Sequence, residues 1–459
     1  MLLTKKAIRI QRILQIGSLL FILLLGMLLR FATANGTIVD HPVRNDGRDY
    51  IAYAWNLKFF DVYSKNFDTV NEPGSTAPQP DAYRPPGYPL MLKVLLDNRV
   101  DPSFWLRTTR VQAWIACLTL ACSTLLAMEL LGTWAGLLVG LLVAISPHQS
   151  IYVSYFLTET LYGALLMAAL GVAVVSLKVS RPRWRYFCAG AAGVLFAATC
   201  LVRPTLNQWV PFLLLLSLVP RIRRLRLEVA TLGFCFLVAM SPWWVRNAGS
   251  THEVSDPHQM MATVHQGSYP DFMYNGDPAT FGYPYAHDPN NARVESSWVS
   301  IFIDLRSKFA RQPLTMLKWY VMGKTAYFFH WSTPEGWHDM FIYPIWRSPW
   351  LTDPMFVLIS AIMRALYVPL IICGLLGTLV AFTGKTSELF EASNVDGLRL
   401  LALMHLFAIG VHVIGAPFSR YSVPFRPLTF MMGIFFLVWS ARNYFPAKPL
   451  TSSVNDSYG

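Results

Sequence analysis

The stretch ILQIGSLLFILLLGMLLRF, residues 13–31, is almost entirely apolar. A helix needs about 20 mostly apolar residues to cross a bilayer, and this stretch is long enough. The whole chain is 54% hydrophobic and only 14% charged, which is too apolar for a soluble globular protein. These features predict an all-α polytopic membrane protein, a helical bundle of about ten spans. The expected spans are residues 12–33, 111–131, 133–147, 153–178, 185–202, 205–220, 226–245, 356–382, 398–416 and 424–441.

Basic residues beside the spans predict the orientation of the chain. The short connections KVSRPRWR (178–185) and RIRRLR (221–226) should face the cytosol, as should the basic N-terminus. Residues 34–110 and 246–355 then form two large outer loops within a transmembrane domain of residues 1–441, and residues 442–459 form a cytoplasmic tail. Ala32-Thr33-Ala34 is similar to a signal-peptidase site, but the length of the first span favours a retained anchor.

Three segments of the outer loops have the pattern of helices that lie on a membrane surface. Residues 49–60 and 86–96 of the first loop read as short amphipathic helices. Residues 314–331 of the second loop are long enough to be considered as a span, but they carry Lys318 and Lys324 among many aromatic residues. This composition favours an interfacial helix.

The net charge and the cysteines exclude several classes of protein. A charge of +12 in a membrane chain indicates contact with anionic lipid or a phosphate-bearing substrate, and no nucleic acid is expected. All six cysteines lie in or at the ends of apolar segments, so we expect free thiols that serve packing. The sequence has no P-loop and no dinucleotide fingerprint. His405 and His412 favour packing roles over a metal site, so no cofactor is predicted, and the need for a divalent metal is left open.

The charged residues at the outer ends of the spans are the candidate site residues, because ionisable groups at a membrane are costly and tend to be functional. Asp46 follows the first span in RNDGRDY (44–50), with Asp49 three residues later. The spacing first suggests that Asp46 is the N-cap of a helix that begins near Gly47; catalysis is the alternative. Arg44 and Arg48 are expected to favour the ionised form of Asp46.

Arginines form the second group of candidates. Arg84 precedes two prolines, which should hold it at a defined place where its guanidinium either pairs with an acid or grips a phosphate. Glu159 needs a partner, either in an ion pair with Arg203 or at the mouth of a substrate cavity. Arg420 and Arg246 lie on the face that the positive-inside tendency leaves poor in charge.

Several of these motifs occur in an order that resembles the GT-C glycosyltransferases, over most of residues 12–441. The resemblance rests on the acid after the first span, YRPPGYPL (83–90), SPHQSIYVSYFLTETLYGALL (146–166), SPWWVRN (241–247) and RYSVPFRPL (420–428). The branch it resembles contains protein O-mannosyltransferases and lipid A aminoarabinose transferases.

The resemblance implies an enzyme of the bacterial inner membrane that transfers a sugar from a polyprenyl-phosphate donor, with inversion, outside the cytosol. It implies that Asp46 is the catalytic base, with Asp49 in reserve, and that Arg84 binds the donor phosphate, helped by Arg203 and Arg420. Tyr83, Tyr88, Glu159 and Arg246 are the expected substrate-binding residues. Trp243 and Trp331 either stack on sugars or anchor the protein at the interface.

The acceptor is the least determined part of this expectation. Protein mannosyltransferases carry an Asp-Glu pair where this chain has NDG (45–47), so a glycan, glycolipid or lipopolysaccharide acceptor is favoured over a protein. The rival class is a non-catalytic transporter or flippase of lipid-linked sugars, which should show repeat symmetry and midplane charges. A polymerase or ligase of long glycans shares the same outer loops.

Overall fold

The computed structural model describes residues 2–72, 74–254 and 258–445. Within these residues, eight helices are long and apolar enough to cross a membrane. A further pair of helices, bent by 57° at its break, brings the count to nine if the pair is one span. The eight are α1 (Leu2–Gly36), α4 (Pro102–Leu131), α7 (Glu159–Lys178), α8 (Pro182–Val202), α10 (Arg226–Thr251), α17 (Pro354–Val380), α19 (Ala392–Ile414) and α20 (Arg426–Tyr444).

The expected count of ten was too high, because two of the apolar stretches are not continuous helices. The bent pair consists of α5 (Thr133–Ile145) and α6 (Pro147–Ile151), and it breaks where Pro147 cannot continue the hydrogen bonding of α5. Residues 205–220 contain only α9 (Trp209–Leu216), which is about 12 Å long. Hydrophobic composition predicted both segments, but it does not report where a helix stops.

Glycines let the long helices pack closely. A Cβ atom on Gly377 of α17 would lie 2.0 Å from the carbonyl oxygen of Met432 in α20. A Cβ atom on Gly193 of α8 would lie 2.2 Å from the carbonyl oxygen of Leu232 in α10. Only glycine permits these backbone approaches, and close packing through small residues is the main source of helix association inside a membrane.

One arginine lies deep in the bundle, and the sequence analysis did not single it out. Arg30 of α1 is fully buried. Its guanidinium donates to the carbonyl oxygens of Val143 (3.1 Å) and Ala144 (3.2 Å) in the last turn of α5 and to that of Gly26 (3.0 Å). The last carbonyls of a helix have no partner within the helix, so the positive group satisfies them.

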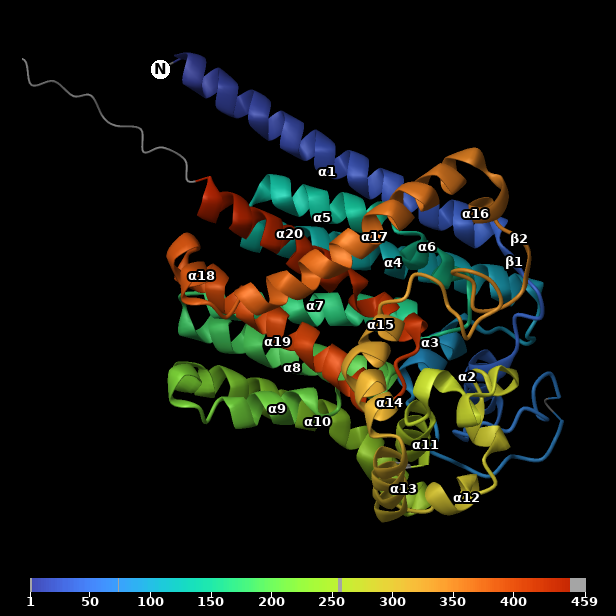
Figure 1. Ribbon diagram of the computed structural model, residues 1–459. Helices are drawn as coiled ribbons and strands as arrows, with labels where there is room; N and C mark the ends of the chain where they lie inside the picture. The colour runs from blue at the N-terminus through green and yellow to red at the C-terminus, as the bar shows by residue number, and fades with distance from the viewer. Residues whose placement is uncertain (1, 73, 255–257, 446–459) are drawn as a thin grey trace, which may run out of the picture.

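The connecting segments gather at one end of the bundle (Figure 1). There β1 (Ile38–Val39) pairs antiparallel with β2 (Ile345–Arg347), which joins the two large loops. The helices of these loops are α2 (Asn45–Phe59), α3 (Gly87–Leu95), α11 (His258–Gly267), α12 (Asn291–Val294), α13 (Trp298–Arg311), α14 (Pro313–Lys318), α15 (Lys324–Phe328) and α16 (Pro349–Thr352). The amphipathic helices predicted at 49–60 and 86–96 are confirmed as α2 and α3.

Short helical turns complete the chain. Between α14 and α15, the π-turn η8 (Trp319–Gly323) divides the segment 314–331, which is not among the eight candidate spans. Its placement at the interface stays a prediction. The 3-10 turns are η1 (Tyr152–Ser154), η2 (Pro204–Leu206), η3 (Pro220–Leu225), η4 (Pro270–Phe272), η5 (Tyr274–Gly276), η6 (Pro278–Thr280), η7 (Pro284–His287) and η9 (Ser419–Phe425).

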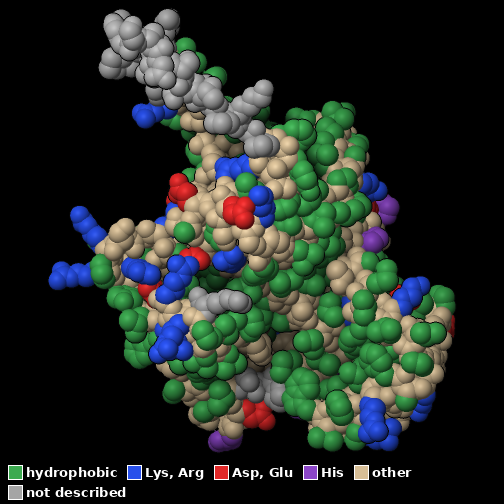
Figure 2. Space-filling view, turned by 60° about the vertical axis from the view of Figure 1, so that its left-hand side comes forward, with side chains coloured by type: hydrophobic (Ala, Val, Ile, Leu, Met, Phe, Trp, Pro, Cys, Tyr) green, Lys and Arg blue, Asp and Glu red, His purple; other side chains and the backbone are tan. Residues whose placement is uncertain are grey.

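The opposite end of the bundle carries the start of α1, α18 (Gly384–Leu389) and the end of α20 (Figure 1). Figure 2 brings this end forward and shows hydrophobic side chains over much of the bundle, with Lys and Arg side chains gathered toward the viewer. The basic connections 178–185 and 221–226 lie between helices at this end. Which end faces the cytosol stays a prediction. Residues 446–459 of the predicted tail lie outside the described residues.

Candidate active site

Asp46 lies in the first turn of α2, at the start of the first large loop. The helix begins at Asn45 and its N-cap residue is Arg44, with extended backbone angles (φ −145°, ψ 160°). The interpretation of Asp46 as the N-cap was therefore wrong. Because the cap position precedes it, the Asp46 carboxylate is available for contacts with side chains from other elements.

Arg84 joins the two acidic residues of α2. Its Nη2 atom donates to Asp46 Oδ1 (2.8 Å) and to Asp49 Oδ2 (2.9 Å), and its Nε atom also donates to Asp49 Oδ2 (3.1 Å). Asp46 and Asp49 are three residues apart and so lie on one face of the helix. The pairing of Arg84 with acids, one of its two predicted roles, is confirmed.

The backbone around Arg84 is held at several points. Tyr63 donates its hydroxyl to the carbonyl oxygen of Arg84 (3.0 Å), and the Arg84 N–H donates to the hydroxyl oxygen of Tyr53 (3.3 Å). Two prolines follow, and Gly87 then packs so closely on α8 that a Cβ atom would lie 2.8 Å from the carbonyl oxygen of Leu201. The guanidinium is thus carried on a rigid support.

Arg420 reaches the same carboxylate from the other end of the chain. Its Nη2 atom donates to Asp46 Oδ2 (2.9 Å), so each oxygen of Asp46 accepts from a different guanidinium. Partial burial would raise the pKa of Asp46, but the positive charges of Arg420, Arg84 and Arg203 lower it well below its usual range. The site therefore keeps Asp46 ionised.

The arginines expected to act on Asp46 were the wrong ones. Arg44 lies over the ring of Tyr343, with 5.4 Å from its guanidinium carbon to the ring centroid. Arg48 lies over the ring of Phe67 at 4.6 Å. Both are neighbours of Asp46 in sequence, but their side chains lie over aromatic rings, and arginines from distant segments bind the carboxylate instead.

Glu159 and Arg203 form the predicted ion pair, with 3.2 Å between Oε1 and Nη1. The Glu159 side chain is only 2% exposed and lies in the first turn of α7. The Arg203 guanidinium also covers the ring of Tyr421 at 3.9 Å from its centroid. Through Tyr421, which follows Arg420, this buried pair supports the arginine that reaches Asp46.

A cavity of about 690 Å³ opens beside these groups. It lies among α2, the segment before α3, α11, the 335–344 segment and η9. Its volume is in the usual range for a small-molecule site. Its walls include Asp46, Tyr83, Arg84, Glu335, Tyr343 and Arg420.

This cavity is not lined by three of the four expected substrate-binding residues: Tyr88, Glu159 and Arg246. Glu159 lies in its buried pair with Arg203. Tyr88 is fully buried in the core, where its hydroxyl donates to Gln112 Oε1 (2.9 Å). Arg246 donates to the carbonyl oxygens of Asp81 (2.7 Å) and Tyr63 (3.1 Å), so it fastens the first loop to α10. Tyr88 and Arg246 hold the structure that carries the site.

The two tryptophans considered as sugar platforms also pack on protein. Trp243 meets the ring of Tyr63 edge-on, with 5.2 Å between centroids. Trp331 meets His148 (4.6 Å) and Tyr367 (5.2 Å) in the same way. Neither is among the residues that line the cavity.

The sequence analysis missed Glu335. One of its oxygens, Oε1, accepts from Ser419 Oγ (3.2 Å) and from the backbone N–H of Arg420 (3.4 Å). Loss of contact with water raises the pKa of Glu335, despite the nearby Arg420. The residue lies in an irregular loop, in STPEGW (332–337), so no periodic pattern marked it.

Among the described residues, no group of three or more His, Cys, Asp or Glu side chains is arranged to hold a metal ion. His405 packs inside the bundle, where its ring nitrogens lie 2.7 Å from the hydroxyl of Thr378 and 3.0 Å from that of Thr429. All six cysteines are free thiols, as predicted.

Comparison with solved structures identifies the fold. No protein-family model matches the sequence, and no curated protein matches it. The archaeal oligosaccharyltransferase AglB from Archaeoglobus fulgidus, in complex with an inhibitory peptide and a dolichol-phosphate, superimposes with a TM-score of 0.51 at 16% identity, over 95% of this chain and 52% of AglB. Its apo form gives a TM-score of 0.51 at 14% identity, over 94% and 51%.

A second solved structure is similar at a lower level. ArnT from Cupriavidus metallidurans bound to undecaprenyl phosphate gives a TM-score of 0.40 at 15% identity, over 94% of this chain and 78% of ArnT. The chain spans about half the length of the AglB structures it matches. The likeness to the AglB structures confirms the predicted GT-C fold, and the long apolar helices confirm a multi-pass helical membrane protein.

Proposed function

We propose that the protein is an inverting glycosyltransferase. It transfers a sugar from a polyprenyl-phosphate donor to a hydroxyl group of an envelope glycan, a glycolipid or lipopolysaccharide, on the extracytoplasmic side of the plasma membrane. One observation carries the proposal: two guanidinium groups from distant segments meet on one carboxylate at the wall of a cavity of about 690 Å³.

Arg84 and Arg420 suit the phosphate of the donor. A guanidinium can hold a phosphate through two parallel hydrogen bonds. As the sugar–phosphate bond breaks, negative charge grows on the leaving phosphate, and arginines that are already in place stabilise it without reorganising. Arg203 adds positive charge from its buried pair with Glu159.

Asp46 suits the role of proton acceptor once the donor is bound. In the transfer, the acceptor oxygen forms a bond to the anomeric carbon, the bond from that carbon to the phosphate oxygen breaks with its electron pair, and the hydroxyl proton passes to the carboxylate. A carboxylate held by two guanidiniums is a weak base. When the donor phosphate accepts hydrogen bonds from Arg84 and Arg420, Asp46 loses those hydrogen bonds. The basicity of Asp46 therefore rises when the donor is bound.

Asp49 is the reserve base, and its contacts favour a positioning role. One of its oxygens accepts two hydrogen bonds from Arg84. The solved AglB structure holds a dolichol-phosphate, which is consistent with a polyprenyl-phosphate donor for this chain. The charges of the site lie at one end of the bundle, which suits surface chemistry better than the passage of a substrate across the membrane.

The test compares wild type with Asp46→Asn. Purified protein in nanodiscs is incubated with labelled polyprenyl-phosphate sugars and an extract of envelope glycans, and labelled product is measured. We expect Asp46→Asn to lower transfer by about a hundredfold or more. Asp61→Asn, an exposed acid after α2, is the matched control and should behave as wild type. Equal transfer by both variants would remove Asp46 from the reaction, and lipid translocation without transfer would favour a flippase.

A further inference from the structure

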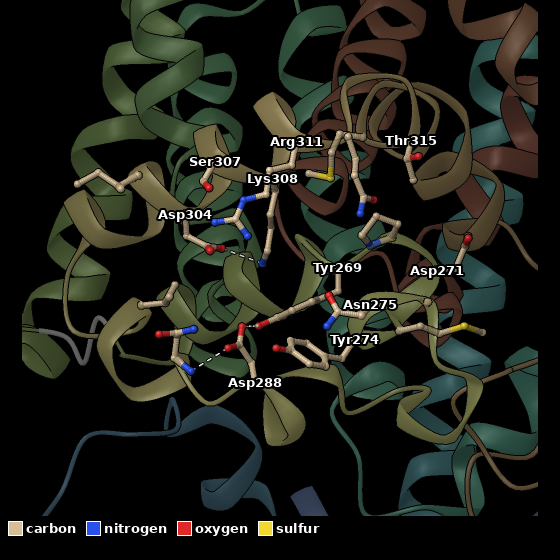
Figure 3. Close-up of a pocket in the computed structure, with 18 of the residues that line it drawn as sticks. Tyr269, Asp271, Tyr274, Asn275, Asp288, Asp304, Ser307, Lys308, Arg311 and Thr315 are labelled. Carbon is tan, nitrogen blue, oxygen red and sulfur yellow. Dashed lines mark hydrogen bonds and ion pairs between the residues drawn. The ribbon is translucent and has the colours of Figure 1, made fainter.

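A second cavity, of about 590 Å³, lies within the second large loop (Figure 3). The first cavity, of about 690 Å³, is called the donor cavity, because the proposed donor phosphate binds there. The walls of the second cavity come from the turns at 269–276, from residues 288–294 and from one face of α13 with the start of α14. Figure 3 shows Lys308 and Arg311 of α13 on one side, and Asp288 and Tyr274 on the opposite side. None of the candidate residues from the sequence analysis lies in it.

The lining has the chemistry of a sugar site. Its ionisable residues balance, with three acids (Asp271, Asp288, Asp304) and three bases (Arg293, Lys308, Arg311). Such a lining disfavours both a lone phosphate and a hydrocarbon tail. Carboxylates, amides and guanidiniums are planar and pair well with neighbouring hydroxyl groups, and the rings of Tyr269 and Tyr274 offer apolar surface with a polar tip.

The cavity is held in shape before any ligand binds. Tyr269 donates its hydroxyl to Asp288 Oδ2 (2.6 Å), and Lys308 lies over the Tyr269 ring at 3.7 Å from its centroid. Lys308 is fixed in turn by Asp304 (2.8 Å) and by Ser268 Oγ (2.7 Å). These contacts leave Asp271, Asn275 and Arg311 as exposed polar groups at the cavity.

Backbone strain marks the same wall. Asp271, Phe272 and Asn275 have positive φ angles (54°, 55° and 51°). For a bulky residue such as Phe272 this conformation is unfavourable, and it persists only when the surroundings hold it. The ring of Phe272 is fully buried and stacks on Phe418, with 4.6 Å between centroids. Phe272 does not line the second cavity itself, but its neighbours Asp271 and Met273 do, and Phe418 lines the donor cavity. The stacked pair therefore lies between the two cavities.

A chain of hydrogen bonds forms a second link between the cavities. His265 is fully buried, its Nδ1 atom lies 3.1 Å from Glu295 Oε1, and its Nε2 atom lies 2.7 Å from the hydroxyl of Tyr269. Glu295 lines the donor cavity, whereas Tyr269 and Asp288 line the second one. The wall between the cavities is therefore thin and connected.

The outer faces of the helices that form this cavity are apolar. On α13, the side chains of Val299 and Phe302 are 68% and 67% exposed, and Leu314 of α14 is 80% exposed. Exposed apolar side chains with basic residues at their edge, here Arg306 and Arg311, are typical of a helix that lies in a membrane interface. A ligand in the cavity would then sit at the depth of lipid headgroups.

We propose that this second cavity binds the sugar headgroup of a membrane-anchored glycolipid. The assignment goes beyond the proposed function, because the second cavity and the donor cavity have no lining residue in common. The headgroup enters from the membrane side along α13 and is held beside the donor cavity, not within it.

The test measures glycolipid binding without any donor. Full-length protein is exchanged into nanodiscs of phosphatidylcholine with a small share of digalactosyldiacylglycerol, and the lipid retained on the protein is counted by native mass spectrometry. We expect wild type to retain the galactolipid over phosphatidylcholine. Arg311→Ala and Asn275→Ala should each lower this retention by about tenfold, as expected for the loss of a charged or paired hydrogen bond. Arg306→Ala, an arginine of the same helix that does not line the cavity, should not.

Several outcomes decide the matter. Equal retention of both lipids by wild type, or equal retention by the cavity variants and Arg306→Ala, would overturn the site. Tight binding of soluble digalactosylglycerol would overturn the membrane-anchored part. If no sugar transfer is found while retention persists, the proposed transferase function fails and the glycolipid site stands.

Discussion

Arg420 and Asp46 are 374 positions apart in the sequence and are joined by a hydrogen bond of 2.9 Å. The contact joins the two ends of the chain at one end of the bundle. Arg420 belongs to η9, just before the last span, and Asp46 belongs to α2, just after the first span. Arg84 completes the group from the middle of the first loop. Three segments thus depend on one another for the placement of their charges.

Replacing Arg420 tests whether the guanidinium itself is needed. Arg420→Lys keeps the charge but loses the planar pair of donors, and we expect kcat to fall by about a hundredfold or more, as for the loss of one donor to a developing anion. The measurement is initial-rate kinetics with labelled donor. Arg364→Lys, a partly exposed arginine of α17 paired with Asp339, is the control. Unchanged kcat in Arg420→Lys would reduce Arg420 to a source of charge.

Replacing Arg84 separates binding from folding. We expect Arg84→Ala to raise the KM for the donor strongly and to cost about 3–5 kcal/mol of stability, because Asp49 loses its partner and Asp46 keeps only Arg420. Arg84→Ala with Asp49→Asn should recover part of that stability without recovering donor use. If donor use and stability recover together, Arg84 has only a structural role.

The pKa of Asp46 sets the expected pH dependence. Because that pKa is lowered, Asp46 contributes stability above its ordinary pKa, and this contribution is lost as the pH falls toward the pKa in the folded protein. Arg420→Gln removes the largest lowering charge, so the pKa of Asp46 should rise and the acid limb of kcat/KM should move to higher pH. The check is a pH–rate profile of both proteins from about pH 3 to about pH 7, a range that includes the ordinary pKa of an aspartate. Profiles with the same acid limb would contradict this assignment.

Glu335 should have the opposite dependence. Its pKa is raised, so its contribution to stability is present below its ordinary pKa and is lost as the pH rises through the pKa in the folded protein. Glu335→Gln keeps an acceptor for the Arg420 N–H and cannot ionise. We therefore expect the Tm of wild type to fall relative to Glu335→Gln as the pH rises from about 4 to about 7. A constant difference would show that Glu335 does not titrate in that range.

The sequence predicted three charges of the site. Asp46 and Arg420 were found because each lies at the end of an apolar span, where ionisable groups are costly. Arg84 was found because the two prolines that follow it hold it at a defined place. Tyr88 was wrongly expected at the site, because proximity to Arg84 in sequence does not reveal that α3 turns this ring into the core. The direction of a side chain depends on packing, which the residue letters alone do not give.

The missed features share a different cause. Glu335 and much of the second cavity lie in the irregular part of the second loop. Its 3-10 turns and residues with positive φ angles have no helical or strand periodicity that the sequence could show. The expected span at 205–220 failed because hydropathy counts apolar residues, whereas α9 ends at Leu216 in tight turns before Pro220. Tertiary contacts over hundreds of residues fix these segments, and no local pattern encodes them.

Gly87 offers a test of the support beneath Arg84. A methyl group at this position would lie 2.8 Å from the carbonyl oxygen of Leu201, so in Gly87→Ala α3 must move away from α8 and carry Arg84 with it. We expect donor KM to rise although no charge has changed, since a displacement of even about 1 Å costs about a hundredfold in positioning. Gly74→Ala, in the same loop with no atom within 4 Å of the added Cβ, is the matched control. Kinetics of Gly87→Ala equal to those of Gly74→Ala would show that the guanidinium finds Asp46 without a rigid backbone, and the proline pair would then need another explanation.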